Sequence, residues 1–257
     1  LPSQDYILTS FNGAWAREFE PTHTPCGPGS VVSGSRCGTS SNRANPFVML
    51  HSPETTEDHG DAYGFHLIYS GDHRACACGN AYDSLRFLHG ISPEDFSWQL
   101  DAGEEFFAPE AAFTYGDGFA AMSRALHRFV REHIVRGTWK KRERPVLVNS
   151  WESLYFRFNH RELVKLAKQG KELGAELFVL DDGWFGKRDS DTCSLGDWTI
   201  LHEKKLPHGL GGLADEICAL GMDFGLWVEP EMISEDSELY RAHPDWILGH
   251  KEQAIGR

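Results

Sequence analysis

The sequence predicts two fold classes in succession, all-β and then α/β: part of an antiparallel β-sandwich, followed by a partial (β/α)8 TIM barrel. Three observations lead to this prediction. Up to about residue 115, short segments alternate polar with apolar residues between Gly, Asn, Asp and Pro. From residue 119 the apolar residues recur at helical spacing. Beyond residue 144 short apolar strands alternate with helices, the order of a β/α fold.

Residues 1–115 are expected to form the sandwich. Residues 64–69, 84–88 and 96–100 show the alternation of half-buried strands. The stretch 26–45 is dense in Gly, Ser, Thr and Pro, so we expect it to be a loop.

A helix is expected to connect the two folds within residues 116–143. Its apolar stripe consists of Phe119, Met122, Leu126, Phe129, Val130 and His133. The basic, irregular residues 139–144 would form the connector.

Residues 144–257 are predicted to be the first three β/α units of an incomplete barrel, with strands at 145–148, 177–180 and 224–228. The four apolar residues at 177–180 indicate a strand buried on both faces, as in parallel sheets. A whole barrel takes about 250 residues. We therefore expect the chain to be a piece of a longer polypeptide.

Two helices are expected between these strands. For the first, Asn159 is a good N-cap, Glu162 completes a capping box and Gly174 ends the helix. Its buried face would be Leu163, Leu166, Ala167, Gly170 and Leu173. The second would bury Leu213, Ile217 and Leu220 and end at Gly221.

Composition excludes several function classes. A net charge of −13 argues against nucleic acid or an anionic membrane as a partner, and no apolar run is long enough to span a bilayer. The chain starts at Leu1 without a signal peptide, and six cysteines lack a disulfide-framework spacing, so we expect reduced thiols in a cytoplasmic protein. Cys76-Ala-Cys78 is too close for a CxxC motif, and the histidines lack metal-ligand spacing. No metal, nucleotide or other cofactor is expected.

Polar and aromatic residues gather where the predicted barrel strands end. Asp181, Asp182 and Trp184 follow the second strand, and Glu229 and Glu231 follow the third. The carboxyl ends of barrel strands form the active site. Carboxylates accept hydrogen bonds from sugar hydroxyls, and an indole face packs on sugar C–H groups, so the pattern indicates a sugar site.

Other interpretations stay open from the residues alone. Asp182 and Glu229 could form the carboxylate pair of a glycosidase. Adjacent Asp181 and Asp182 suit binding of two neighbouring hydroxyls better than acid/nucleophile roles, and such a pair can also be a loop cap with a salt-bridged carboxylate. Trp151 and Trp227, at the ends of the flanking strands, could equally be core residues.

Motifs along nearly the whole chain resemble α-galactosidases of glycoside hydrolase family 36. In the second part they are Arg144-Pro-Val-Leu-Val-Asn-Ser-Trp-Glu152, Glu176-Leu-Phe-Val-Leu-Asp-Asp-Gly-Trp-Phe-Gly-Lys-Arg188, Ser194-Leu-Gly-Asp-Trp198, Leu206-Pro, Gly225-Leu-Trp-Val-Glu-Pro-Glu-Met232 and Tyr240-Arg-Ala-His-Pro-Asp-Trp246. In the first part they are Ser41-Ser, Asn45-Pro-Phe47, Thr56-Glu-Asp-His-Gly60 and Tyr69-Ser-Gly71. Residues 1–115 would then be the C-terminal part of the family's N-terminal sandwich domain.

The resemblance implies a retaining, metal-free release of terminal α-galactose from oligosaccharides such as melibiose or raffinose. Asp181 and Asp182 would bind the galactose 4- and 6-hydroxyls. Trp151 and Trp227 would wall the pocket. The remaining matched positions are Trp198 on the leaving-group side and Arg257 near the sugar.

The family's nucleophile lies in a Lys-x-Asp motif on a later strand, and no such motif follows Trp227. This implies that the chain carries neither catalytic carboxylate and is inactive alone. Residues 42–44 also depart from the histidine-rich run common in the family, which puts any loop contact there in doubt. Two other functions stay open: a non-catalytic galactose-binding protein or subunit, and an α-N-acetylgalactosaminidase. Bacterial members are often tetramers, so the full-length protein could be a homo-oligomer.

Overall fold

The structure is a computed structural model that describes residues 1, 3–41, 43–94 and 96–247. The chain divides into two compact units, Leu1–Lys141 and Arg142–Arg257. Each unit has its own core.

The first unit contains two antiparallel sheets. The five-stranded sheet has the order β2-β1-β4-β5-β8, with β1 Ile7–Ala14, β2 Arg17–Pro25, β4 Ala44–His51, β5 Asp61–Leu67 and β8 Ala111–Asp117. The three-stranded sheet has the order β3-β6-β7, with β3 Gly29–Gly34, β6 His73–Gly79 and β7 Leu85–Ile91.

Apolar residues from both sheets form one core. Leu8, Val48 and Leu50 of the larger sheet share a cluster with Ala75 and Ala77 of the smaller one. Val48, Leu50 and Ala75 are fully buried. Two antiparallel sheets with a shared core make a β-sandwich, as the sequence predicts.

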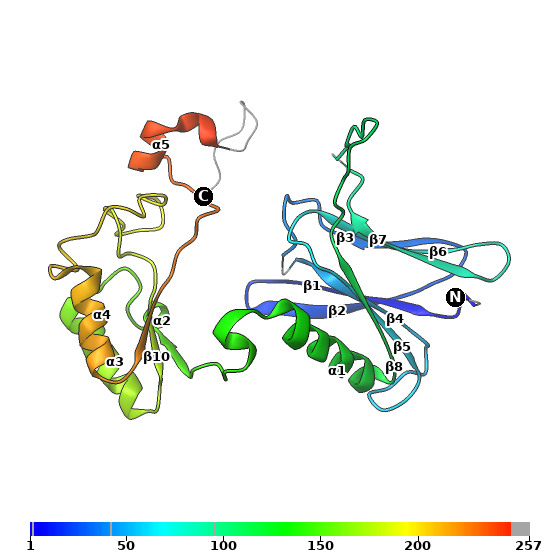
Figure 1. The fold of residues 1–257 in the computed structure, drawn as a ribbon, viewed down its shortest axis with the longest axis horizontal. Coiled ribbons are helices and arrows are strands. Elements are labelled where there is room, and N and C mark those ends of the chain that lie inside the picture. The colour runs from blue at the N-terminus through cyan, green and yellow to red at the C-terminus, as the bar shows by residue number, and fades with distance from the viewer. Residues whose placement is uncertain (2, 42, 95, 248–257) are drawn as a thin grey trace. The chain divides into compact units, whose positions relative to one another are not determined.

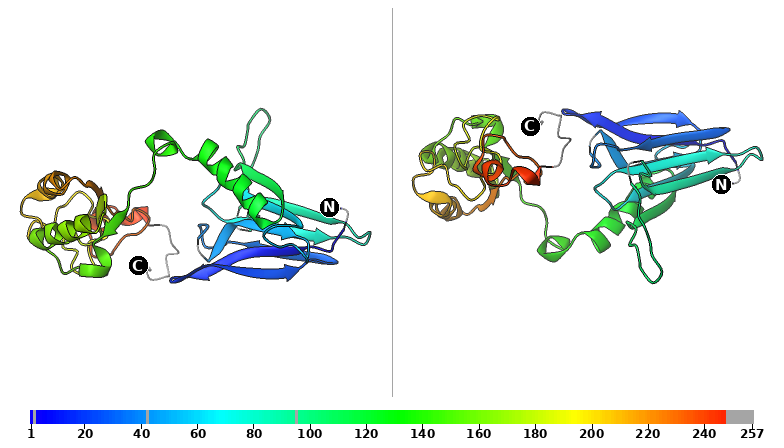
Figure 2. Two further views of the ribbon diagram at one scale, coloured as in Figure 1. Left: turned by 90° about the horizontal axis from the view of Figure 1, so that it is seen from below. Right: turned by 90° about the horizontal axis from the view of Figure 1, so that it is seen from above.

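Helix α1, Phe119–Phe129, packs on β8 and β5 of the same unit (Figures 1 and 2). Met122 is buried in a second cluster with Phe11 and Phe47, so the helix covers another part of the five-stranded sheet. A π-helical turn, Val130–Ile134, and a 3-10 turn, Gly137–Lys140, follow. The predicted stripe is therefore right for the first turns, but His133 is exposed.

Two predictions for the first unit are wrong. Residues 96–100 form no strand; they belong to the long segment between β7 and β8, where the rings of Phe96 and Trp98 lie 6.0 and 5.2 Å from that of Phe106. Residues 26–45 are not one loop, because they contain β3 and the start of β4. Pairing of β3 with β6 outweighs the weak strand propensity of its Gly and Ser residues.

The second unit has three parallel strands in the order β11-β10-β9, with β9 Leu147–Asn149, β10 Leu177–Leu180 and β11 Asp223–Leu226. The helices are α2 Trp151–Leu154, α3 His160–Glu172, α4 Gly209–Ala219 and α5 Glu238–Ala242, with a 3-10 turn at Pro244–Trp246. Helices α3 and α4 lie side by side against the strands (Figure 1). Strands in chain order with helices between them are the succession of a β/α barrel, which confirms the predicted fold class.

Helix α3 begins and ends as its sequence predicts. The Asn159 side chain accepts from the Glu162 N–H, and Glu162 accepts in return from the Asn159 N–H, which completes the capping box. Gly174 has a φ of 93° just after the helix. Leu173 is the exception to the predicted buried face: it is the C-cap, where the chain turns outward, and 90% of its surface is exposed.

The strands are less enclosed than predicted. Phe178 and Leu180 of β10 are fully buried against the helices, whereas Leu177 and Val179 on the opposite face are half-buried. Val146 and Leu147 are 61% and 51% exposed. They are exposed because β9 is an edge strand among the described residues of this sheet.

Candidate functional site

The carboxyl ends of the three parallel strands bring Asn149, Asp181 and Trp227 to one edge of the sheet. Asn149 Nδ2 donates a hydrogen bond of 2.6 Å to Asp181 Oδ2, and the Asp182 backbone N–H donates one of 2.7 Å to Oδ1. The Asp181 N–H itself donates to Ser150 Oγ at 3.0 Å. The last residues of β9 and the turn after it thus fix the half-buried Asp181 carboxylate.

Asp182 is held by a different partner. Arg188 Nε donates to Asp182 Oδ1 at 2.9 Å, and Nη2 donates to Oδ2 at 2.8 Å. Both residues are buried, at 6% and 3% exposure, and Arg188 Nη1 also donates to the Cys193 carbonyl. A two-pronged contact of this kind fixes the carboxylate in orientation as well as position. The two adjacent carboxylates are therefore held by two different elements.

The loop between Asp182 and Arg188 is fastened by Lys205. The buried Lys205 Nζ donates to the carbonyls of Gly183 (3.1 Å) and Arg188 (2.8 Å) and lies 2.9 Å from Asp189 Oδ1. The ammonium group also lies 4.8 Å from the centre of the Phe158 ring. All three N–H donors of the lysine therefore have acceptors, and both ends of the loop are tied to one atom.

Gly183 is required by this loop. Its φ of 101° is in the region that favours glycine. A Cβ there would lie 3.1 Å from the Phe158 ring and 3.3 Å from Lys205 Nζ. Only glycine permits this turn next to the lysine.

The aromatic residues take two kinds of position. Trp184 is buried in the core, and its indole N–H donates to the Trp227 carbonyl at 3.0 Å. The ring of Trp198 lies 6.3 Å from that of Trp184 and 6.2 Å from that of Trp227. Trp198, Trp227 and Trp151 are half-buried, so each keeps some exposed surface, which Trp184 at 4% exposure does not.

The carboxyl group of Glu229, after β11, is close enough to Asp182 and Arg188 for their charges to change its pKa. Burial raises the pKa of its carboxyl, and the carboxylates of Glu231 and Asp182 raise it further, against a lowering by Arg188. Glu231 is exposed. Arg257, the remaining sequence-predicted site residue, lies outside the described residues.

Sequence reasoning missed three residues that shape this site: Asn149, Arg188 and Lys205. In the sequence, Arg188 follows the predicted strand by eight residues and Lys205 lies in the long loop beyond it, and neither differs from other charged residues. Their burial, which demands partners, follows from the folded loop and not from any local pattern.

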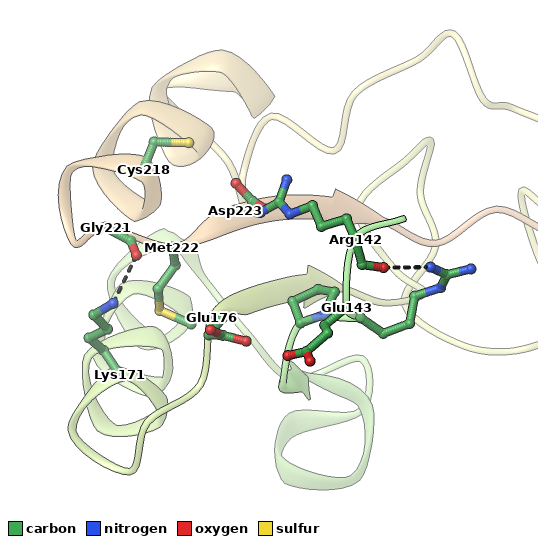
Figure 3. A pocket seen from close by; sticks show the side chains of 10 residues that line it. Arg142, Glu143, Lys171, Glu176, Cys218, Gly221, Met222 and Asp223 are labelled. Carbon is green, nitrogen blue, oxygen red and sulfur yellow. Dashed lines mark hydrogen bonds and ion pairs between the residues drawn. The ribbon is translucent and has the colours of Figure 1, made fainter. Parts of the chain in front are cut away.

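A hollow of the second unit lies elsewhere, at the amino ends of the strands (Figure 3). It measures about 730 Å³ and is lined by charged residues of both signs, among them Arg142, Lys171, Glu176 and Asp223. Lys171 Nζ donates to the Gly221 carbonyl at its rim. Active sites of β/α barrels lie at the opposite, carboxyl end, so this hollow is not the candidate site.

The part of the chain that the structure describes has no candidate membrane span and no cluster of three or more metal-ligating side chains. No helix there is long and apolar enough to cross a membrane. No group of three or more His, Cys, Asp or Glu side chains is placed there to hold a metal ion.

The described chain is a β-sandwich followed by β/α units, with paired carboxylates and indoles at the strand ends, an arrangement that suits carbohydrate binding. Residues 1–101 match the glycosyl hydrolase family 36 N-terminal domain, and residues 105–257 match melibiase. The chain belongs to the melibiase family of glycoside hydrolases, family 36.

Named relatives agree with this assignment. The chain is 47% identical over 249 residues to α-galactosidase AgaA of Geobacillus stearothermophilus, covering 96% of this chain and 34% of the relative. It is 44% identical over 246 residues to α-galactosidase Mel36A of Lactobacillus acidophilus, covering 95% and 34%. A crystal structure of an AgaA variant in complex with raffinose superposes with a TM-score of 0.95 at 45% identity, covering 100% of this chain and 36% of that one. The chain thus spans about a third of the length of these relatives.

Proposed function

We propose that this chain forms the galactose-binding part of an α-galactosidase that removes terminal α-D-galactose from oligosaccharides such as raffinose and melibiose. The observation that carries the proposal is the pair Asp181 and Asp182, fixed side by side at the carboxyl end of β10 by Asn149 and Arg188. Fixed, adjacent acceptors suit two neighbouring hydroxyls of one sugar. The similarity to α-galactosidases, one of which binds raffinose, supports galactose as that sugar.

Asp181 and Asp182 would accept hydrogen bonds from the 4- and 6-hydroxyls. Each carboxylate has about four lone-pair positions, so both can accept a sugar hydroxyl beside the protein donors they already bind. The axial 4-hydroxyl distinguishes galactose from glucose. A buried acceptor left without its hydroxyl costs about 1–3 kcal/mol, which makes the pair a determinant of epimer specificity.

The half-buried indoles would complete the pocket. Trp151 and Trp227 flank the Asp181 end of the sheet and would pack on the sugar's C–H groups. Trp198, whose ring contacts that of Trp227, would border the leaving-group side. Arg257 would add a cation near the sugar.

The chemistry would be a double displacement through a covalent galactosyl intermediate, with retention and without a metal. We propose that the nucleophile and the acid/base come from a segment of the longer protein outside these 257 residues. The alternative pair, Asp182 and Glu229, is disfavoured because the Arg188 guanidinium pairs with both Asp182 oxygens and offsets their negative charge, which suits an acceptor of hydroxyl hydrogen bonds better than a nucleophile.

Calorimetric titration with galactose and glucose tests the proposal. Galactose is expected to bind at least about tenfold more tightly than glucose, since one unmatched acceptor is worth about 1.4 kcal/mol or more. Asp181→Asn and Asp182→Asn are tested separately, and the variant that loses the acceptor of the axial 4-hydroxyl should lose most of this preference. Asp223→Asn, at the other end of the sheet, is the matched control and should leave it unchanged.

Hydrolysis of nitrophenyl α-galactoside separates the remaining possibilities. The 257-residue chain should give none, and the full-length protein should be active. Turnover by the chain alone would refute the placement of the catalytic pair. Galactose binding without turnover by the full-length protein would favour the non-catalytic galactose-binding alternative, and a preference for the N-acetylgalactosamine substrate would favour the aminidase.

We also propose that the protein is cytoplasmic and that the full-length form is a homo-oligomer. The six free cysteines support a reducing compartment. The oligomer rests on the family resemblance.

A further inference from the structure

Cys76 and Cys78 lie side by side on strand β6, far in the sequence from the sugar site. Their Sγ atoms are 3.1 Å apart. Successive side chains of a strand point to opposite faces, so residues two apart share one face. A single residue between two cysteines is too few for a CxxC motif. On a strand, the same spacing places both thiols on one face.

The pair lies on the outer face of the three-stranded sheet. Neighbours Ala75 and Ala77 point the other way, into the sandwich core. On the outer face Cys76 lies opposite Val32 and Leu88, which are 49% and 46% exposed. The two thiols are thus on the face away from the shared core, where Cys78 is half-buried and Cys76 is buried, at 7% exposure.

The Ser30 hydroxyl also contacts the cysteine pair. Ser30, opposite Cys78 on β3, donates its hydroxyl to Cys78 Sγ at 3.5 Å. This hydrogen bond lowers the pKa of the Cys78 thiol, with smaller contributions from Cys76, Arg86 and Arg74. Burial raises the pKa of the Cys76 thiol. Cys78, which is half-buried, is the thiol that ionises first.

We propose that Cys76 and Cys78 form a two-thiolate binding site for a soft, thiophilic metal ion. Thiolates are the ligands that such ions prefer. Two sulfurs on one tetrahedral ion, each bonded at about 2.3 Å, lie roughly 3.8 Å apart, so a small rotation of the outer thiol opens the pair to that distance. A disulfide needs about 2.05 Å between sulfurs and about 3.8 Å between Cβ atoms, whereas the Cβ atoms of alternate residues on one strand face are roughly 6–7 Å apart.

The charge balance agrees with a divalent ion. Two thiolates neutralise it, so the neighbouring Arg74 and Arg86 guanidinium groups do not oppose binding while they favour the ionised thiols. Among the described residues no third His, Cys, Asp or Glu side chain joins the pair. Water or a small thiol would fill the other positions. This inference is independent of the proposed sugar chemistry.

Titration of the reduced, metal-free protein with Cd²⁺ tests the site, because thiolate-to-cadmium charge transfer absorbs in the ultraviolet. One Cd²⁺ per chain is expected. Cys78→Ser should weaken binding at least about tenfold, and Ser30→Ala, which removes the supporting hydrogen bond, about tenfold. The exposed Cys37 and Cys218 supply the control variants, Cys37→Ser and Cys218→Ser, which should bind Cd²⁺ as the parent does.

A second readout covers the case in which Cys76→Ser does not fold. Bound Cd²⁺ should protect Cys76 and Cys78, and not Cys37, from alkylation by iodoacetamide in peptide mass spectrometry. The proposal is overturned if folded Cys78→Ser binds Cd²⁺ as tightly as the parent. It is equally overturned if the reduced parent gives no charge-transfer band, or if the two cysteines close a disulfide in place of taking up the ion.

Discussion

The two ends of the parallel sheet carry ion pairs of the same chemistry in opposite settings. At the carboxyl end Arg188 and Asp182 lie 2.8 Å apart with side chains only 4% and 8% exposed. At the amino end Arg142 and Asp223 lie 3.6 Å apart with side chains 57% and 58% exposed. Both ends carry many charged residues, but only the carboxyl end holds its ion pair buried and in close contact.

The difference shows that side-chain geometry is fixed at the carboxyl end of the sheet and not at the amino end. Removing two charges from water costs several kcal/mol per ion, which only near-ideal hydrogen bonding offsets. At the carboxyl end that bonding comes from the Arg188 guanidinium, which donates to Asp182, and from Lys205 Nζ, which donates to the Arg188 carbonyl. The amino end keeps its charges solvated, where a pair contributes little. A fixed carboxylate fits the proposed role in sugar binding, whereas the solvated charges at the amino end need no fixed geometry.

Arg188→Met should have the largest effect on stability. It leaves the Asp182 carboxylate buried without a partner, and breaking a buried pair in this way costs about 3–5 kcal/mol. The free energy of unfolding from urea denaturation, followed by tryptophan fluorescence, measures it.

Two further variants test whether the loss in Arg188→Met comes from the buried Asp182 charge. Asp182→Asn combined with Arg188→Met should be less damaging than the sum of the single changes, because the uncompensated charge is gone. Arg241→Met removes an exposed arginine that pairs with Asp236 and Glu238 and serves as the matched control, with little change expected. Equal losses for Arg188→Met and Arg241→Met would contradict the distinction between buried and solvated pairs.

Lys205→Met should have an intermediate effect. The change leaves the Gly183 and Arg188 carbonyls without the ammonium donor, and hydrogen bonds to a charged group are worth about 2 kcal/mol. Asp189 is largely exposed and can turn to water, which limits the loss. Lys204→Met, one residue earlier and exposed, is the control. If both variants unfold at the same urea concentration, Lys205 is not stabilising the loop.

Much of the fold follows from the sequence because local and tertiary preferences agree there. The capping box at Asn159 and the glycine after α3 are local signals, and the structure has them where the sequence places them. Four apolar residues before Asp181 predict a strand of a parallel sheet, and β10 pairs in parallel on both sides. Residues 96–100 show the limit: their alternation is real, but no neighbouring strand pairs with them, and a strand needs a partner.

The sequence predicts that the candidate site residues follow a strand, and Asp181 and Asp182 do follow β10, but the side chains that hold them were not predictable. A strand followed by two carboxylates indicates the carboxyl end of a barrel strand from sequence alone. That Asn149 holds one carboxylate and Arg188 the other depends on strand register and on the path of a loop, which no local pattern encodes. Trp184 shows a different error: its place in the sequence suggests a site residue, but its side chain is buried in the core.

Arg142→Ala, at the amino end, should have the smallest effect. Its pair with Asp223 spans 3.6 Å and is more than half exposed, so solvent screens it and the expected loss is at most about 1 kcal/mol. Raising the salt concentration should shrink even that difference, because exposed pairs are screened within about 10 Å at 0.1 M ionic strength. The Arg188→Met loss should instead persist in high salt. A salt-independent loss for Arg142→Ala comparable to that of Arg188→Met would mean that both ends of the sheet are held by structural ion pairs, and the contrast between them would fail.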